Sequence, residues 1–174
     1  MDRRIFVATS IGLMAGGIQC ASGTESPSWR SQLLGIWSLV DASTIAVAGD
    51  EVKPWFGRHT PITGVIIYLD NGWMSAQISG AKPGTISRGD FGKLAAADRV
   101  KWLDEYYAYY GTFEVDEAAR VITHRVADSL LPYEKETVYK RKFELDNGVL
   151  ALLTEPRDNG GKTTFNRLVW KKAT

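Results

Sequence analysis

Two side chains in the second half of the chain, His124 and Arg141, are of types that could bind or transform a ligand. Residues 120–127 alternate apolar and polar side chains, which is typical of a β-strand, and this puts His124 on one face with Ile122 and Val126. An imidazole on an apolar face could orient a ligand or transfer a proton near neutral pH. The alternative is a core histidine that is hydrogen-bonded to a tyrosine.

Arg141 lies in a second alternating segment, residues 137–145. It shares one face of this segment with Tyr139, Phe143 and Leu145. A guanidinium keeps its proton, so an inward-facing arginine needs a carboxylate or a ligand anion beside it. Glu114 or Asp104 could be an internal partner. The other interpretation is an anchor for a ligand carboxylate, enolate or phenolate.

Aromatic side chains are the third candidate feature, since 11% of the residues are Phe, Trp or Tyr. Their rings offer flat apolar walls, and tyrosine hydroxyls can donate hydrogen bonds to an oxyanion, although aromatic residues also form ordinary core and rim. Four tyrosines lie close together, at positions 106, 107, 109 and 110. The residues expected to contact a ligand are Trp37, Tyr68, Met74, Tyr106, Tyr139 and Phe143. The candidates for catalysis are His124, Arg141 and Tyr109.

Other kinds of site find no support in the sequence. His59 and His124 are the two histidines and stand far apart without metal-ligand spacing, so we expect no metal site. The glycine-rich stretches fit neither a dinucleotide-binding nor a phosphate-binding motif, and we expect no cofactor. A formal net charge of +1 gives no basic excess for nucleic acid, so no nucleic-acid partner is expected.

The elements that must position these side chains are mostly strands. Alternating or apolar runs predict about eight strands, at residues 33–40, 65–69, 73–78, 110–115, 120–127, 137–145, 149–154 and 163–171. Asn-Gly at 71–72 and at 147–148 predicts tight hairpins. Helical spacing predicts one helix, from Lys93 to about Ala108. The expected fold is all-β, an antiparallel up-and-down barrel of about eight strands with one helix inserted mid-chain, and a β-sandwich is the alternative.

The first 23 residues have the pattern of an export signal. Asp2-Arg3-Arg4 precedes an apolar run that is too short to span a bilayer, and small residues follow it. The paired arginines are similar to a twin-arginine signal, and an ordinary secretory signal is the alternative. Cleavage after Gly23 would remove Cys20, the single cysteine, and would bring the formal net charge to zero. We therefore expect a signal over 1–23, a linker over 24–32, and one barrel domain over 33–174.

The order of several motifs resembles the bacterial and fungal lipocalin-like domain family. These motifs are residues 33–40, 64–75, 109–116, 121–124, 141–145 and 167–170, and they span the expected domain. The resemblance implies a lipocalin-like, calycin-type barrel with an internal cavity. Where the family often has two consecutive histidines, this chain has His124 followed by Arg125, so the resemblance supports no role that needs a histidine pair.

Together these features predict an exported barrel, periplasmic or secreted, that binds a small hydrophobic or aromatic molecule in its interior. The alternative is an isomerase, lyase or cyclase that needs no cofactor. In it, His124 would be the general acid or base, and Arg141 with Tyr109 or Tyr68 would stabilise negative charge. The expected partner is the small molecule, with a second copy of the chain as an open alternative. No stable membrane insertion is expected after cleavage.

Overall fold

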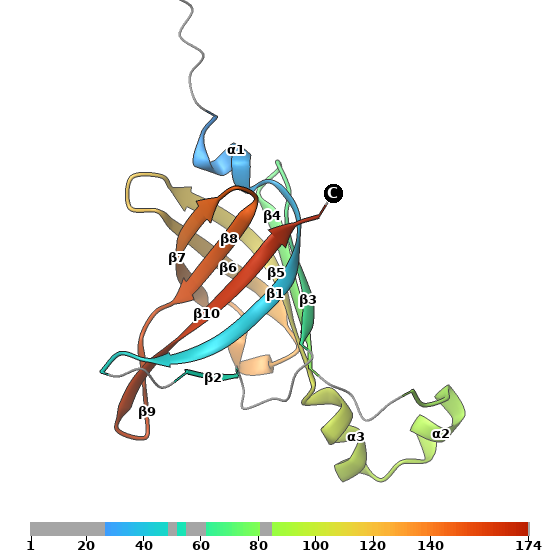
Figure 1. Ribbon diagram of the computed structural model, residues 1–174. Coiled ribbons are helices and arrows are strands. Elements are labelled where there is room, and N and C mark those ends of the chain that lie inside the picture. The colour runs from blue at the N-terminus through green and yellow to red at the C-terminus, as the bar shows by residue number, and fades with distance from the viewer. Residues whose placement is uncertain (1–26, 49–51, 55–61, 81–84, 174) are drawn as a thin grey trace, which may run out of the picture.

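Eight long antiparallel strands form the body of the molecule in the computed structural model (Figure 1). The structure describes residues 27–48, 52–54, 62–80 and 85–173. The long strands are β1 (Gly35–Ala46), β3 (Thr63–Tyr68), β4 (Trp73–Ser79), β5 (Tyr106–Asp116), β6 (Val121–Ser129), β7 (Val138–Asp146), β8 (Val149–Thr154) and β10 (Lys162–Lys172). Two short strands, β2 (Val52–Pro54) and β9 (Arg157–Asn159), pair antiparallel with one end of β1 and of β10 respectively.

The sheet closes on itself. Each long strand pairs with the next one along the chain, and β1 also pairs with β10, in a register that runs from Trp37 opposite Lys172 to Ala46 opposite Thr164. Closure removes the exposed edges that an open sheet would leave. The predicted up-and-down barrel is therefore confirmed, and the sandwich alternative is wrong.

Glycines allow the tight connections between neighbouring strands. Gly72 has φ +86° in the β3–β4 turn, and both Asn147 and Gly148 have positive φ in the β7–β8 turn. Positive φ at both central positions is the requirement of a two-residue hairpin turn whose twist matches that of the strands. Asn147-Gly148 meets this requirement, whereas in the β3–β4 turn only Gly72 of the pair has positive φ. Both Asn-Gly pairs lie in hairpin turns, as the sequence predicts.

The helical insertion differs from the single expected helix. Between β4 and β5 the chain forms two short helices, α2 (Arg88–Lys93) and α3 (Ala96–Leu103). The expected helix extends too far, because Tyr106, Tyr107 and Ala108 pair with β4 and begin β5. A short helix, α1 (Trp29–Leu33), occupies the end of the expected linker and the first residue of the expected domain, so the first strand begins at Gly35 rather than at Leu33.

Alternation along the strands separates an apolar interior from a polar exterior. In β6, Ile122, His124 and Val126 are buried while Arg125 is exposed. In β7, Tyr139 and Phe143 are buried, and Arg141, which lies between them on the same face, is half-buried. The inward orientation expected for His124 and Arg141 agrees with this pattern.

Candidate functional site

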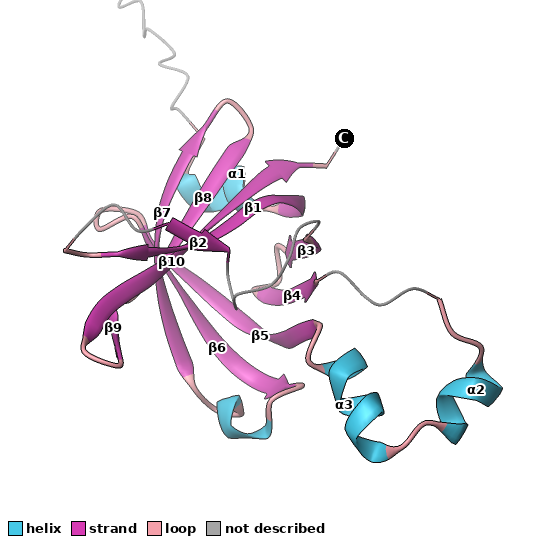
Figure 2. Ribbon diagram, turned by 60° about the horizontal axis from the view of Figure 1, so that its bottom comes forward, coloured by secondary structure: helices cyan, strands magenta, loops and turns pink. Residues whose placement is uncertain are grey.

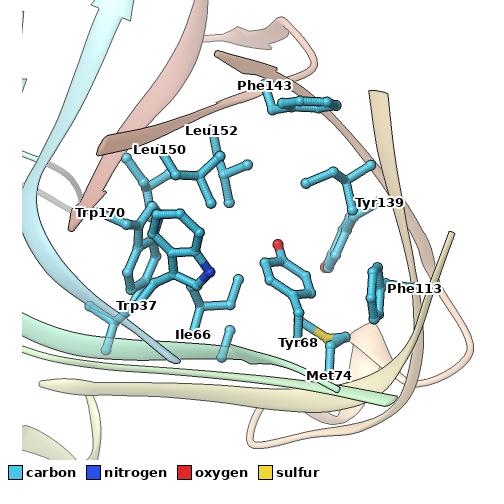
Figure 3. Close-up of a cluster of buried hydrophobic side chains, with 14 of the residues drawn as sticks. Trp37, Ile66, Tyr68, Met74, Phe113, Tyr139, Phe143, Leu150, Leu152 and Trp170 are labelled. Carbon is cyan, nitrogen blue, oxygen red and sulfur yellow. The ribbon is translucent and has the colours of Figure 1, made fainter. Parts of the chain in front are cut away.

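The short helix α1 covers one end of the barrel (Figure 1). Trp29 of α1 packs edge-on against Phe143, with ring centroids 6.1 Å apart. Trp37 Nε1 donates a hydrogen bond of 2.7 Å to the carbonyl of Leu33, the last residue of α1. Figure 3 shows the large side chains that point into the interior from different strands, among them Trp37, Tyr68, Phe143 and Leu150, which do not line the cavity. This half of the barrel is therefore a packed core.

The other half of the interior is hollow and contains a cavity of about 540 Å³. This volume lies in the range of roughly 300 to 1,000 Å³ that is typical of small-molecule sites. Its apolar wall is formed by Ile66, Ala76, Ile78, Leu152, Leu168 and Trp170. The cavity lies at the end of the barrel that carries β9 and the 3-10 helix η2 (Pro132–Glu134), which is turned toward the reader in Figure 2. Exposed residues such as Tyr133 and Arg157 also line it, so the cavity reaches the surface.

A buried carboxylate, Glu134, lies in the cavity wall. Its Oε1 accepts a hydrogen bond of 3.2 Å from the hydroxyl of Tyr107, and its Oε2 accepts one of 2.9 Å from Ser129 Oγ. Burial raises the pKa of Tyr107, and the neighbouring Tyr109 and Glu134 raise it further. The carboxylate is therefore held by hydroxyl donors of the protein.

Arg141 lines the same cavity without an acidic partner. In the part of the chain that the structure describes, no carboxylate lies within ion-pair distance of its guanidinium. Its Nη1 donates to the Lys140 carbonyl at 3.2 Å, and the guanidinium lies over the Tyr139 ring, 4.6 Å from the centroid. The two expected internal partners are wrong: Glu114 pairs with Arg125 on the outer surface, and Asp104 is exposed at the end of α3. The charge of Arg141 is thus available to the cavity.

A chain of three side chains connects β3, β6 and β5 through the barrel interior. The Tyr68 hydroxyl lies 2.9 Å from His124 Nε2, and the Tyr109 hydroxyl lies 2.9 Å from His124 Nδ1. Tyr109 lines the cavity, whereas His124 and Tyr68 do not. His124 is completely buried. The imidazole therefore lies behind Tyr109 and reaches the cavity only through the Tyr109 hydroxyl.

Burial determines the protonation of these groups. Desolvation, with a smaller contribution from the positive charge of Arg141, lowers the pKa of His124 to about 3, so the ring is neutral at physiological pH. Burial raises the pKa of Tyr109 to about 12, although Arg141 opposes this shift by its charge and as a hydrogen-bond donor. Burial also raises the pKa of Tyr68. Both tyrosines consequently keep their hydroxyl protons at neutral pH.

The structure brings some of the predicted site residues to the cavity and not others. Tyr109, Arg141 and Tyr139 line it. Trp37, Tyr68, Met74 and Phe143 are buried in the packed half instead, and His124 lies between the two regions. Tyr106 lies on the other face of β5, where its hydroxyl donates to Gln77 Oε1 at 2.7 Å.

Most cavity residues are missing from the sequence-based set, among them the polar pair Tyr107 and Glu134. Tyr107 is two residues before Tyr109, so strand alternation could have selected it in place of Tyr106. The expected helix included this position, so strand alternation was not applied to Tyr107. Glu134 follows Pro132 in a short 3-10 helix, and the sequence carries no periodic signal there. Its place in the wall depends on the path of the β6–β7 connection.

The described residues lack a cluster of metal ligands and a helix that could span a membrane. They contain no group of three or more His, Cys, Asp or Glu side chains that could hold a metal ion. Among them there is also no helix that is both long and apolar enough to cross a membrane. His59 and the expected signal over residues 1–23 lie outside the described residues.

Comparison with known proteins gives one finding on the family. A family model described as a lipocalin-like domain matches residues 34–173, which is most of the chain and includes every strand of the barrel. A search of curated protein sequences finds no match.

Proposed function

The chain belongs to the lipocalin-like domain family, and from this premise we propose that it binds a small hydrophobic or aromatic molecule inside the barrel. The observation that carries the proposal is the cavity of about 540 Å³, which occupies one half of a closed barrel and reaches the surface. Its walls combine aliphatic side chains with tyrosine rings and a few polar groups. This combination is typical of sites that bury most of a small ligand.

Binding to the wall would be driven mainly by burial of apolar surface. A ligand contributes about 25 cal/mol for each Å² of apolar area that it removes from water. The strands hold the wall residues in place through continuous pairing on both sides, from β1 round to β10. A rigid, preformed wall lowers the entropic cost of ordering side chains on binding.

The arrangement around His124 favours binding over the catalytic alternative. A general base must lie within hydrogen-bond reach of the proton that it removes. Both ring nitrogens of His124 are already hydrogen-bonded to tyrosines, and the ring does not line the cavity. Its lowered pKa, about 3, also makes it a weak base at neutral pH.

Titration of the full chain with phenols, steroids and fatty acids, followed by tryptophan fluorescence, tests the proposal. Trp170 lines the cavity and is a natural reporter. We expect a saturable change with at least one class of ligand. Ala76→Phe should weaken binding at least about tenfold, since Ala76 is buried in the wall and the added ring fills the cavity.

A matched control is Ala108→Phe on the outward face of the neighbouring strand β5. It adds the same ring outside the cavity and should leave affinity unchanged. Circular dichroism establishes that both variants are folded. The absence of saturable binding for every class, or equal affinity in both variants, would refute interior binding.

We further propose that residues 1–23 direct export and that the protein acts in the periplasm or outside the cell. The support is the sequence pattern of this segment, above all Arg3 and Arg4 followed by an apolar run. Fractionation of cells that express the full chain, with mass spectrometry of the exported product, tests both the route and the cleavage after Gly23. Retention of the intact chain in the cytoplasm would contradict the proposal, whereas loss of export in an Arg3→Lys, Arg4→Lys variant would support the twin-arginine route.

A further inference from the structure

The direction of the hydrogen bonds around His124 follows from the surroundings of Tyr68. A neutral imidazole has one N–H donor and one acceptor nitrogen, so one tyrosine donates to the ring and the other accepts from it. Tyr68 is 1% exposed, and among the described residues its hydroxyl has a single hydrogen-bond partner, His124 Nε2. If Tyr68 accepted from the ring, its own buried proton would have no acceptor. Tyr68 therefore donates to Nε2, and the ring carries its proton on Nδ1.

This direction leaves the Tyr109 hydroxyl proton without an acceptor among the residues that the structure describes. Tyr109 accepts from His124 Nδ1–H, and its neighbour Arg141 can only donate. Glu134 is also near, but its oxygens accept from Tyr107 and Ser129. No acceptor for its proton is found in the described part of the chain, and the hydroxyl belongs to a residue of the cavity wall. The site thus offers a hydroxyl donor, held in place from behind by the buried imidazole.

Arg141 supplies further donors to the same cavity. Its guanidinium packs on the Tyr139 ring, 4.6 Å from the centroid, and one nitrogen reaches the Lys140 carbonyl, which leaves other N–H groups free to bind. The carboxylate of Glu134, in the same wall, is not a second group that could bind the ligand in this way. Both its oxygens already accept hydrogen bonds from hydroxyl groups, and no ion pair joins it to Arg141 among the described residues.

We propose that Tyr109 and Arg141 together form a subsite for the carboxylate of the ligand, so that the ligands of this barrel are small apolar or aromatic carboxylic acids. A carboxylate accepts two or more hydrogen bonds and matches the planar fork of a guanidinium. A hydroxyl donor beside the fork would complete its coordination. The apolar body of the acid would lie against the aliphatic wall formed by residues such as Ile78 and Leu168. This inference rests on the proposed function and narrows it to one ligand class.

Matched pairs of ligands test the inference. We would measure the affinity of the full chain for 4-phenylbutanoic acid and decanoic acid, each against the primary amide of the same skeleton, by calorimetry at neutral pH. The acids should bind at least about tenfold more tightly than their amides, since charge-assisted hydrogen bonds are about twice as strong as neutral ones. Equal affinity of acid and amide would overturn the subsite but leave interior binding intact. Absence of binding by all four compounds would overturn the subsite, and interior binding would be refuted as well if phenols and steroids also fail to bind.

Substitutions test whether Tyr109 and Arg141 cause the preference for acids over amides. Arg141→Met should lower affinity for the acids about 10- to 100-fold and change affinity for the amides by less than about threefold. Tyr109→Phe should lower affinity for the acids several-fold. Arg125→Met is the matched control, because Arg125 lies on the outer surface of the adjacent strand β6. Unchanged acid affinity in folded Arg141→Met would contradict the subsite. If this variant does not fold, Arg141→Lys, which keeps the charge but not the fork, replaces it and should weaken acid binding less.

The direction of the hydrogen bonds has its own test. Nitrogen NMR of the histidine side chains in the ligand-free full chain distinguishes the two neutral tautomers. We expect His124 to carry its proton on Nδ1. A proton on Nε2 would mean that Tyr109 donates to the ring and has no proton left for a ligand, which would overturn the role of Tyr109.

Discussion

Acid should destabilise this protein through His124 by an amount that can be calculated. The native ring is neutral because burial, and secondly the charge of Arg141, lower its pKa to about 3. In the unfolded chain the same group has the ordinary pKa of about 6.5. Between these two values the unfolded state binds a proton that the native state does not bind. The contribution of His124 to the free energy of unfolding is therefore complete above about pH 6.5 and declines as the pH falls toward 3.

The expected size of the effect between pH 7 and pH 5 is about 2 kcal/mol of unfolding free energy. This value depends on the unfolded pKa and barely on the native one, because the native ring remains almost wholly unprotonated at pH 5. His124 is completely buried and both its nitrogens are hydrogen-bonded, so solvent does not screen the effect.

Urea unfolding at the two pH values measures the effect, with His124→Gln as the comparison. The side chain of glutamine keeps a donor and an acceptor but does not titrate. The chain has two histidines, so both proteins should carry His59→Gln, which leaves His124 as the one titrating imidazole. Between pH 7 and pH 5, the free energy of unfolding should fall by about 2 kcal/mol more in the protein that retains His124 than in the glutamine variant. Equal losses in the two proteins would refute the buried, neutral histidine.

Two further substitutions test the packing that shapes the site. Gly111→Ala should unfold the barrel or lower the free energy of unfolding by at least about 3 kcal/mol in chemical denaturation. The reason is that the new Cβ would collide with the backbone of Arg125 and Ala127 at the β5–β6 bulge. Near-native stability would contradict this close approach. Leu33→Ala should lower the free energy of unfolding by about 2 to 5 kcal/mol, since Leu33 is completely buried where α1 closes the barrel. A loss below about 1 kcal/mol would show that α1 adds little to the core.

The barrel itself could be predicted because its signals are local. Alternation in segments such as 120–127 gives each strand its inner face, and Asn-Gly pairs set two of the turns. The boundary between the helical insertion and β5 could not be predicted in this way. Tyr106 and Tyr107 form a strand because they pair with β4, and pairing with a segment almost thirty residues away in sequence overrides local helical spacing.

The candidate site could be predicted only in part for a similar reason. Alternation correctly predicts that the Arg141 side chain points inward, but it does not predict which half of the barrel interior is filled by side chains. That depends on α1, whose Trp29 and Leu33 close one end, and on large side chains such as Trp37 that fill the space beneath them. The partners of His124 come from β3 and β5, and a single sequence has no local signal for such contacts.

The structure of a complex with the most tightly bound ligand is the most direct test of binding inside the barrel. We predict that the ligand occupies the cavity between Ala76 and Leu168, with an acceptor oxygen within hydrogen-bond distance of Tyr109 and Arg141. A ligand found on the outer surface of the barrel, with the cavity wall unchanged, would contradict the account.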